Sequence, residues 1–305
     1  MPITNTVISI FLLLFIGYGT KKVRLLKAED AEILNNVVVY LTLPAFIFEA
    51  IYSYREPLPL DIAKVPIIGF AMIAVTLGAA YFVGKALKLN KPTLAGLMLA
   101  AGFGNTGFLG YPVIKTAFTQ KAALLTAVMY DEVAMALPLY TLGVAIASGF
   151  AGERFDRKQF VRVLTLPSMI AIPVGLILRP VALPLPLLTS IRYLSEGTIP
   201  LVMISLGLSL SARSLKGYAA PVLAACALKM ILLPFLTYHS LRAGGVNGVM
   251  LQAGVLESGM PSAVMTCVIA AKFGANAKFV AAAIFVSTLL SIAAIPTVLA
   301  MLGVR

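Results

Sequence analysis

An apolar stretch of the chain, residues 94–114, is interrupted by residue types that fit poorly inside a helix. It reads LAGLMLAAGFGNTGFLGYPVI, with four glycines between positions 102 and 110, followed by Pro112. In a helix interior, glycine costs about 1 kcal/mol and proline about 3 kcal/mol relative to alanine. The stretch is nevertheless apolar enough to enter a bilayer. We therefore expect a broken transmembrane helix here.

The same arrangement returns 152 positions later in the chain. When Gly96–Gly107 is aligned with Gly248–Gly259, six of twelve residues are identical, including three glycines. This similarity indicates an internal duplication. Two interrupted apolar segments at corresponding positions of two halves are typical of the substrate site of a secondary transporter.

The composition is that of a polytopic, all-α membrane protein. The chain is 60% hydrophobic and only 12% charged, and it repeatedly runs ~20 residues without a charge, enough to cross the ~30 Å core of a bilayer. Breaks at charges, turn residues and prolines predict ten spans. They are residues 4–20, 32–52, 63–86, 93–119, 121–147, 161–179, 187–211, 217–241, 247–272 and 276–303.

The basic residues predict the orientation. Lys and Arg fall in short clusters between apolar runs and not on one face, which argues against nucleic-acid binding despite the net charge of +12. Loops on one side of the predicted membrane hold fifteen of them, and loops on the other side hold eight. Because cytoplasmic loops are enriched in Lys and Arg, we expect both termini to be extracytoplasmic at the inner (cell) membrane.

The longest polar connection divides the chain into two halves. Gly149–Gln159 falls at the midpoint, so we expect a first repeat over residues 1–148, a cytoplasmic linker over 149–160 and a second repeat over 161–305. Each half then holds five spans. Because five is odd, the halves would have opposite orientations in the membrane, which is an inverted-topology repeat.

Four charged residues lie deep in predicted spans, where charges usually line a cavity or pair with each other. They are Asp131, Glu132, Lys229 and Glu257. Asp131 and Lys229 could form a buried ion pair that only fixes helix packing, or could take part in ion coupling. Glu132 points ~100° away from Asp131 around a helix, so we favour Asp131 over Glu132. Glu257 is expected inside the second break, where unpaired backbone groups could help it to bind a cation.

Both breaks carry polar side chains, and the helix ends beside them suit ligands. At the offset of 152, Asn105 and Thr106 correspond to Glu257 and Ser258. Half-helix N-termini favour an anionic group, and unwound carbonyl groups favour a cation. We expect Asn105 and Glu257 to lie close together and to be able to hold sodium. The predicted substrate-binding residues are Asn105, Thr106, Gly107, Gly110, Pro112, Ser258, Gly259 and Pro261; the predicted ion-coupling residues are Asp131, Lys229 and Glu257.

The chain resembles the auxin efflux carrier family, which includes the plant PIN proteins and bacterial permeases for small carboxylates. The residues that carry the resemblance are the motif from Asn105 to Pro112, Asp131 in the next span, and Lys229 followed by Pro234. The resemblance implies two inverted repeats with spans four and nine crossing, as in bile-acid sodium symporters and sodium/proton antiporters. It also implies a scaffold of spans 1, 2, 6 and 7, a transport domain of spans 3–5 and 8–10, elevator-type motion, and room for a homodimer through the scaffold.

The expected function is secondary transport of a small organic anion, such as an auxin-like carboxylate or a dicarboxylate, coupled to H⁺ or Na⁺ without another cofactor. A uniporter driven by membrane potential, a channel and a sensor are the alternatives. An intramembrane aspartyl enzyme is disfavoured because Tyr130–Asp131 lacks a partner GxGD motif. Zinc, P-loop and dinucleotide motifs are also missing from the sequence. We therefore expect no enzymatic activity.

Overall fold

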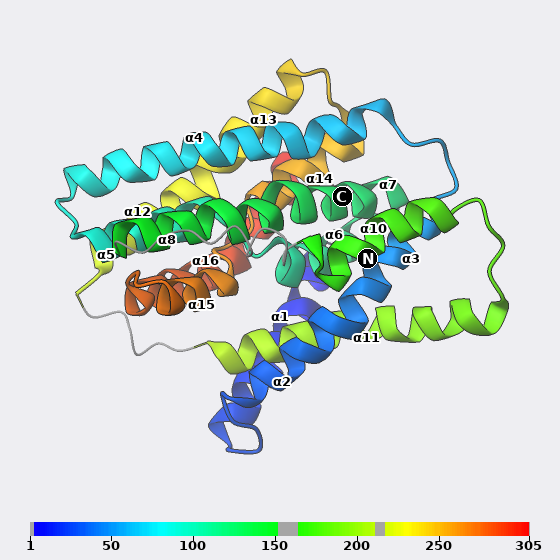
Figure 1. Ribbon diagram of the computed structural model, residues 1–305, viewed down its shortest axis with the longest axis horizontal. Coiled ribbons are helices and arrows are strands. Elements are labelled where there is room, and N and C mark those ends of the chain that lie inside the picture. The colour runs from blue at the N-terminus through cyan, green and yellow to red at the C-terminus, as the bar shows by residue number, and fades with distance from the viewer. Residues whose placement is uncertain (1–2, 152–163, 211–216, 305) are drawn as a thin grey trace.

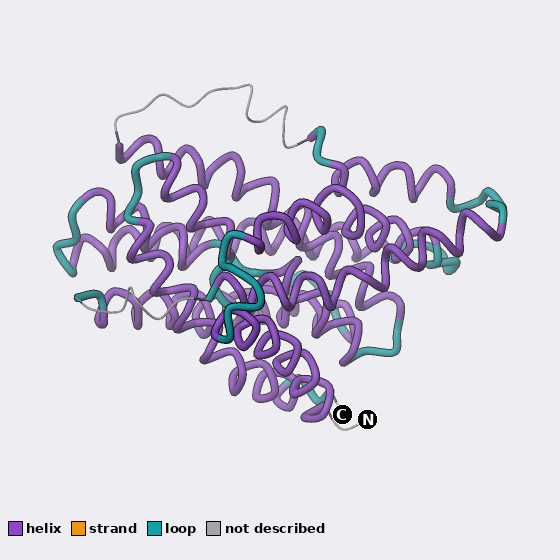
Figure 2. Tube along the Cα trace, turned by 90° about the horizontal axis from the view of Figure 1, so that it is seen from below, coloured by secondary structure: helices purple, strands orange, loops and turns teal. Residues whose placement is uncertain are grey.

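The computed structural model describes residues 3–151, 164–210 and 217–304 of the chain. Every regular element in these ranges is a helix, and loops join the helices (Figure 2). Residues 152–160 of the expected linker lie outside the described ranges. In the part described, five helical stretches are long and apolar enough to cross a bilayer, which agrees with an all-α membrane protein. They are Asp30–Tyr52, Leu60–Ala86, Lys121–Phe150, Ala219–Ala243 and Ala277–Met301.

The first half of the chain runs from α1 to α8 (Figure 1). Short π-helical or 3-10 segments, named η, extend or join several of its α-helices. The elements are α1 (Ile3–Lys22), α2 (Asp30–Val37), η1 (Val38–Thr42), α3 (Leu43–Tyr52), η2 (Leu60–Ala63), α4 (Lys64–Ala86), α5 (Lys91–Gly102), η3 (Thr106–Gly110), α6 (Tyr111–Ala117), α7 (Lys121–Met129), η4 (Tyr130–Ala136), η5 (Leu139–Gly143) and α8 (Val144–Ala151).

The second half has a similar succession of helices. The described elements are α10 (Pro167–Leu178), α11 (Leu185–Ser209), α12 (Ala219–Ala227), η7 (Leu228–Leu232), α13 (Leu233–Ala243), α14 (Gly248–Ser258), α15 (Val264–Lys272) and α16 (Ala277–Met301).

The helix bounds of the two halves correspond at an offset of 155–157 residues, not at the 152 read from the glycines. Lys64–Ala86 corresponds to Ala219–Ala243, and Lys91–Gly102 corresponds to Gly248–Ser258. The identities at offset 152 therefore align residues that occupy different positions in the two helices. At the structural offset, Asn105 corresponds to Pro261, and Glu257 no longer corresponds to Asn105. Glycine identities give the wrong alignment of the two halves, because a glycine can occur at a close helix–helix contact as well as at a helix break.

Four π-helical turns end two residues before a proline. They are η1 before Pro44, η3 before Pro112, η4 before Pro138 and η7 before Pro234. A proline ring clashes with the carbonyl group four residues earlier and has no N–H to donate. A wider turn relieves this clash inside a membrane helix, where freed backbone groups need new partners. Two of these turns carry buried charged residues: η4 carries Asp131 and Glu132, and η7 carries Lys229.

The helices pack in two groups, which divide the molecule. The first group, α1, α2, α3, α10 and α11, forms close pairs such as α1 with α11 and α3 with α10. The second group contains α4 to α8 and α12 to α16, and a continuous apolar cluster from Val65 to Ile284 lies within it. In Figure 1, α4 and α13 run along one side of the molecule, while α1, α2 and α11 lie on the other. Contacts between the groups include α1 with α6 and α3 with α7.

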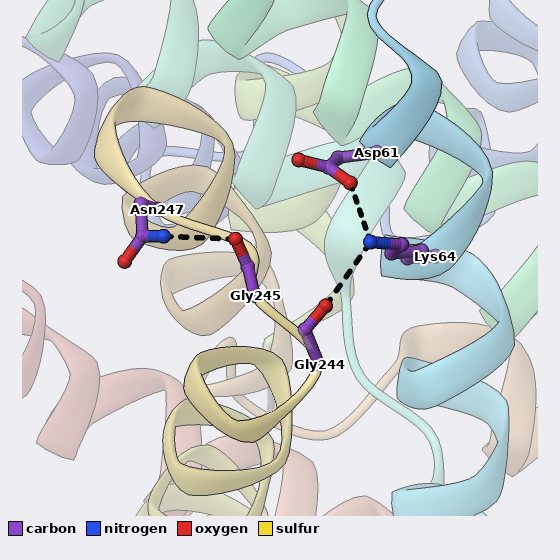
Figure 3. Close-up of polar contacts among 5 residues, drawn as sticks. All are labelled: Asp61, Lys64, Gly244, Gly245 and Asn247. Atoms are coloured by element: carbon purple, nitrogen blue, oxygen red, sulfur yellow. Dashed lines mark hydrogen bonds and ion pairs between the residues drawn. The ribbon is translucent and has the colours of Figure 1, made fainter.

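A polar cluster ties the start of α4 to the loop between α13 and α14 (Figure 3). Lys64 forms an ion pair with Asp61 at 2.7 Å and donates a hydrogen bond to the carbonyl oxygen of Gly244 at 3.1 Å. The Asn247 side chain donates to the carbonyl oxygen of Gly245 at 2.8 Å. Gly245 has φ = +79°, a conformation that glycine adopts readily. The cluster fixes the ends of two long helices of the second group.

Candidate functional site

The two interruptions meet inside the protein and form a crossover. Helix α5 ends at Gly102, α14 ends at Ser258, and the extended backbones that follow pair with each other through a β-bridge between Gly104 and Ser262. The Asn105 N–H donates to the Pro261 carbonyl oxygen at 2.7 Å, and the Ala263 N–H donates to the Phe103 carbonyl oxygen at 3.0 Å. Buried backbone N–H and carbonyl groups outside a helix need hydrogen-bond partners. Each break therefore supplies hydrogen-bond partners to the backbone of the other.

Glu257 does not lie in the second break, contrary to the sequence-based expectation. It occupies the last turn of α14, and the break begins only after Ser258. Both carboxylate oxygens of Glu257 are buried and have no hydrogen-bond partner in the part of the chain described. The helix continues through Glu257 because Gly254 packs tightly on Val65 within a regular turn and does not end the helix.

A cavity of about 100 Å³ lies beside the crossover. This is several times the ~10–15 Å³ that one water molecule requires. Both helix groups line it. The lining residues are Val39, Leu43, Gly104, Asn105, Thr106, Gly107, Phe108, Asp131, Glu132, Met135, Ala136, Leu139, Tyr140, Leu166, Ser168, Ala263, Val264 and Met265.

The polar wall of the cavity is built by the first break and by η4. The Asn105 side chain is 5% exposed, and its amide nitrogen has no hydrogen-bond partner among the described residues. Thr106 donates a short hydrogen bond to Oδ1 of Asp131. The helix that starts at Thr106 presents its first turn to the cavity, where N–H groups have no partner within the helix. The wall thus offers amide donors next to carboxylates.

Two consecutive carboxylates line the cavity, although a regular α-helix would direct them ~100° apart. Both belong to the π-helical turn η4, and both line the cavity. Glu132 also faces α10, where the Ser168 hydroxyl donates to its Oε2 at 3.2 Å. The sequence favoured Asp131 over Glu132, whereas both carboxylates line the cavity.

Lys229 and Glu257 lie behind the crossover and do not line the cavity. Lys229 is fully buried, and its ammonium group donates a short hydrogen bond to the Ser258 carbonyl oxygen. Lys229 and Asp131 do not form the ion pair considered from the sequence: within the described ranges, the ion pairs are Lys64–Asp61 and Arg192–Glu49. Instead the charge of Lys229 interacts with the carboxylate of Glu257. Glu257 directly precedes Ser258, whose carbonyl oxygen accepts the hydrogen bond from Lys229. The turn η7 directs Lys229 toward the end of α14, away from η4.

Comparison with known proteins identifies the family. The family model described as "Membrane transport protein" matches residues 2–160 and 153–299. The chain belongs to the auxin efflux carrier family of membrane transport proteins. The proteins of this family are described as membrane transporters, not as enzymes.

Three relatives cover nearly the whole carrier. A protein of Methanothermobacter thermautotrophicus named an uncharacterized transporter is 33% identical over 301 residues, 97% of each chain. One of Methanocaldococcus jannaschii with a similar name is 32% identical over 296 residues, 94% of this chain and 95% of its own. A "Putative malonate transporter" of Rhizobium meliloti is 28% identical over 305 residues, 96% of this chain and 93% of its own.

The predicted site residues of the carrier fall into two sets. Asn105, Thr106, Gly107 and Asp131 line the cavity. The others build or support the crossover: the Pro261 carbonyl oxygen accepts from the Asn105 N–H, the Ser258 carbonyl oxygen accepts from Lys229, Gly259 lies beside Pro234, Gly110 lies against the Glu257 carboxylate, and Pro112 is in the first turn of α6. The described residues contain no cluster of three or more His, Cys, Asp or Glu that could hold a metal ion.

Several residues that line the cavity were not among the candidates from the sequence. Ser168 follows Pro167 at the start of α10, and Tyr140 and Met265 come from η5 and α15. None of them belongs to a pattern that the sequence could reveal. For Glu132 a signal did exist, because Pro138 six residues later accompanies a π-helical turn that changes the direction of the side chain.

Gly110→Ala is expected to destabilise the carrier by about 1–3 kcal/mol, as overpacking of a filled interior does. A Cβ atom at Gly110 would overlap the carboxylate of Glu257, which is itself fully buried. Unfolding of the detergent-solubilised protein measures the change. Gly78→Ala is the matched control, because nothing lies within 4 Å of a Cβ atom there. Equal unfolding temperatures for the two variants would contradict the close contact between Gly110 and Glu257.

Proposed function

We propose that the protein is a secondary transporter that binds a small organic anion in the cavity beside the crossover. The observation that carries this proposal is the Asn105 amide, which is buried, lines the cavity and has no partner for its N–H groups. A buried donor without a partner costs free energy, so its retention is explained if a ligand supplies the acceptor. A carboxylate is such an acceptor, and its hydrogen bonds are stronger than those of a neutral group.

The size of the cavity supports a small substrate. About 100 Å³ suits an anion of a few heavy atoms, and the apolar lining from Val39, Leu43 and Leu139 would contact a short carbon chain. The relative in Rhizobium meliloti carries malonate in its printed name. We propose a short mono- or dicarboxylate, of which malonate is the first to test.

The two helix groups support an elevator mechanism. We propose that α1 to α3, α10 and α11 form a scaffold against which the remaining helices move as a transport domain. The cavity lies at the boundary, since Val39, Leu43 and Ser168 come from one group and the crossover and η4 come from the other. Relative motion of the groups would carry such a site across the membrane, as alternating access requires.

Ten spans in two inverted repeats would accommodate this arrangement. The offset of 155–157 between helix bounds supports a duplication, and each half contains one helix broken at the crossover. We propose that each half crosses the membrane five times, with the second half inverted, and that the linker near residues 149–160 is cytoplasmic. A homodimer through the scaffold is compatible with this division, because the transport domain would remain free to move.

The topology can be tested with reporters in a bacterial host. Both termini are expected outside the cytoplasm, because Lys and Arg are more numerous in the loops of the opposite side. A periplasmic reporter fused after Arg305 should be active, and the same reporter inserted at Gly149 should be inactive. Activity of a cytoplasmic reporter at the C-terminus would contradict this orientation.

Coupling to H⁺ or Na⁺ is proposed because the buried charges do not balance. Among the described residues, Asp131, Glu132 and Glu257 are buried together with one buried ammonium group, that of Lys229. Several ionised carboxylates in a medium of low dielectric constant are unfavourable unless cations or protons compensate them. Binding of an anionic substrate increases the need for a compensating cation or proton. Asn105 and Glu257, which the sequence suggested for sodium, remain candidates with Asp131 for ion coupling.

Uptake by proteoliposomes tests the proposed function. Labelled malonate, succinate, acetate and citrate would be offered with proton, sodium and potassium-diffusion gradients imposed one at a time. We expect saturable uptake of the short carboxylates, stimulated by unlabelled substrate on the opposite side, with citrate excluded by size. Accumulation driven by membrane potential alone would indicate a uniporter. Failure to move any carboxylate under any gradient would contradict the proposal.

A further inference from the structure

Glu132 is the carboxylate of the cavity that touches both helix groups. It belongs to η4 of the second group, and it is 2% exposed. Its Oε2 accepts a hydrogen bond from Ser168 at 3.2 Å, and Ser168 lies in the first turn of α10 in the first group. Asp131, by contrast, is bonded to Thr106 within its own group. The bond from Glu132 therefore crosses the boundary that the proposed movement would separate.

Among the described residues that line the cavity, none carries a positive side chain to balance an incoming anion. The titratable groups near Glu132 are Asp131 on the same turn, Tyr111 from α6 and Tyr140 from η5, while α10 contributes the uncharged Ser168. In the described ranges, Lys, Arg and His do not contribute to the lining of this cavity. The buried ammonium group of Lys229 lies behind Gly104 and is bonded to Ser258. Two ionised carboxylates and a substrate carboxylate would therefore repel one another.

The unpartnered Asn105 amide shows independently that the cavity is built for an acceptor. If a side-chain carboxylate of the cavity binds a proton beside the substrate carboxylate, the site loses one negative charge. Ser168 fits either state of Glu132, since a hydroxyl group can donate to a carboxylate and accept from a carboxylic acid. Glu257 fits this role less well, because it does not line the cavity and shares its surroundings with Lys229.

We propose that Glu132 binds the coupling proton, in a site that it shares with the transported carboxylate. This inference rests on the proposed function and names its coupling ion and the residue that carries it. The Glu132 carboxylate takes up one proton as the substrate binds, and returns the proton to the solvent on the other side after the substrate has left. One proton then accompanies each substrate. The change in charge also alters the Glu132–Ser168 bond across the boundary.

The test compares the parent with Glu132→Gln, which keeps the size of the side chain but cannot bind a proton. Proteoliposomes would be clamped at zero membrane potential with potassium and valinomycin, and labelled malonate would be offered with and without an inward gradient of one pH unit. For the parent, coupling to one proton predicts about tenfold accumulation. For Glu132→Gln, the ratio of accumulation with and without the gradient is expected to be about one, whatever its absolute rate.

Glu49→Gln is the matched control, because Glu49 is a partly exposed carboxylate that pairs with Arg192 outside the cavity. This variant is expected to keep the tenfold ratio. Liposomes without protein correct for passive movement of the acid. A second measurement needs no variant: a pH-sensitive dye inside parent proteoliposomes should report acidification when external malonate is added.

Each outcome separates this inference from the proposed function. The inference is overturned if Glu132→Gln follows the pH gradient as the parent does, or if malonate enters the parent without acidification. It is also overturned if only sodium or membrane potential drives the parent, although the proposed function would then stand. If the parent moves no carboxylate under any gradient, the proposed function itself fails. Where Glu132→Gln does not fold, the dye measurement on the parent decides.

Discussion

Lys229→Met is expected to destabilise the folded carrier by about 3–5 kcal/mol, the range found when one partner of a buried charge pair is removed. The substitution deletes a fully buried ammonium group and leaves the Ser258 carbonyl oxygen without this donor. It also leaves Glu257 as a buried carboxylate whose oxygens have no hydrogen-bond partner among the described residues. Chemical unfolding of the detergent-solubilised protein measures the loss.

Two further variants show whether charge is the cause. Lys229→Met combined with Glu257→Gln should recover most of the stability, because no unbalanced charge then remains at the crossover. Lys64→Met removes a lysine that is 48% exposed, and it should cost no more than ~1 kcal/mol. If Lys229→Met is as stable as the parent, or if the double variant is no better than the single one, the charges of Lys229 and Glu257 do not stabilise each other.

Asn105→Leu is expected to reduce the affinity for the transported anion about 10- to 150-fold while leaving the fold intact. A hydrogen bond to a charged group contributes about 1.5–3 kcal/mol, and each 1.4 kcal/mol corresponds to a tenfold change. Because the amide nitrogen has no partner in the described part of the protein, its removal costs no internal hydrogen bond. Uptake as a function of substrate concentration, measured beside unfolding, separates the two effects.

The matched control is Gln252→Leu, which removes an amide that donates to the Leu302 carbonyl oxygen at 2.9 Å, away from the cavity. It should lower stability slightly and leave the affinity for the anion unchanged. An Asn105→Leu variant that transports like the parent would show that the amide does not bind the substrate. A variant that fails to fold would show that Asn105 is needed for the crossover.

The sequence by itself determined the class of the protein and the location of its first break. Long uncharged runs require helices that satisfy their own backbone hydrogen bonds in a bilayer, and glycines followed by Pro112 disfavour a continuous helix. Asn105, Thr106 and Asp131 were selected because polar groups in such places are costly unless they are used. The inverted repeat and the orientation in the membrane are predictions that await the reporter experiment.

Only the tertiary structure decided how the buried polar groups are distributed. A glycine repeat cannot distinguish a helix end from a packing contact. The offset of 152 therefore predicted Glu257 inside the second break, whereas α14 continues to Ser258 and the break begins at Gly259. The π-helical turn η4 forms because of Pro138 and its neighbours, and it brings Glu132 into the cavity beside Asp131. Lys229 bonds to the end of α14 and not to Asp131. The bond of Lys229 to Ser258 and the packing of Gly254 on Val65 join residues more than twenty positions apart, for which a single sequence carries no local signal.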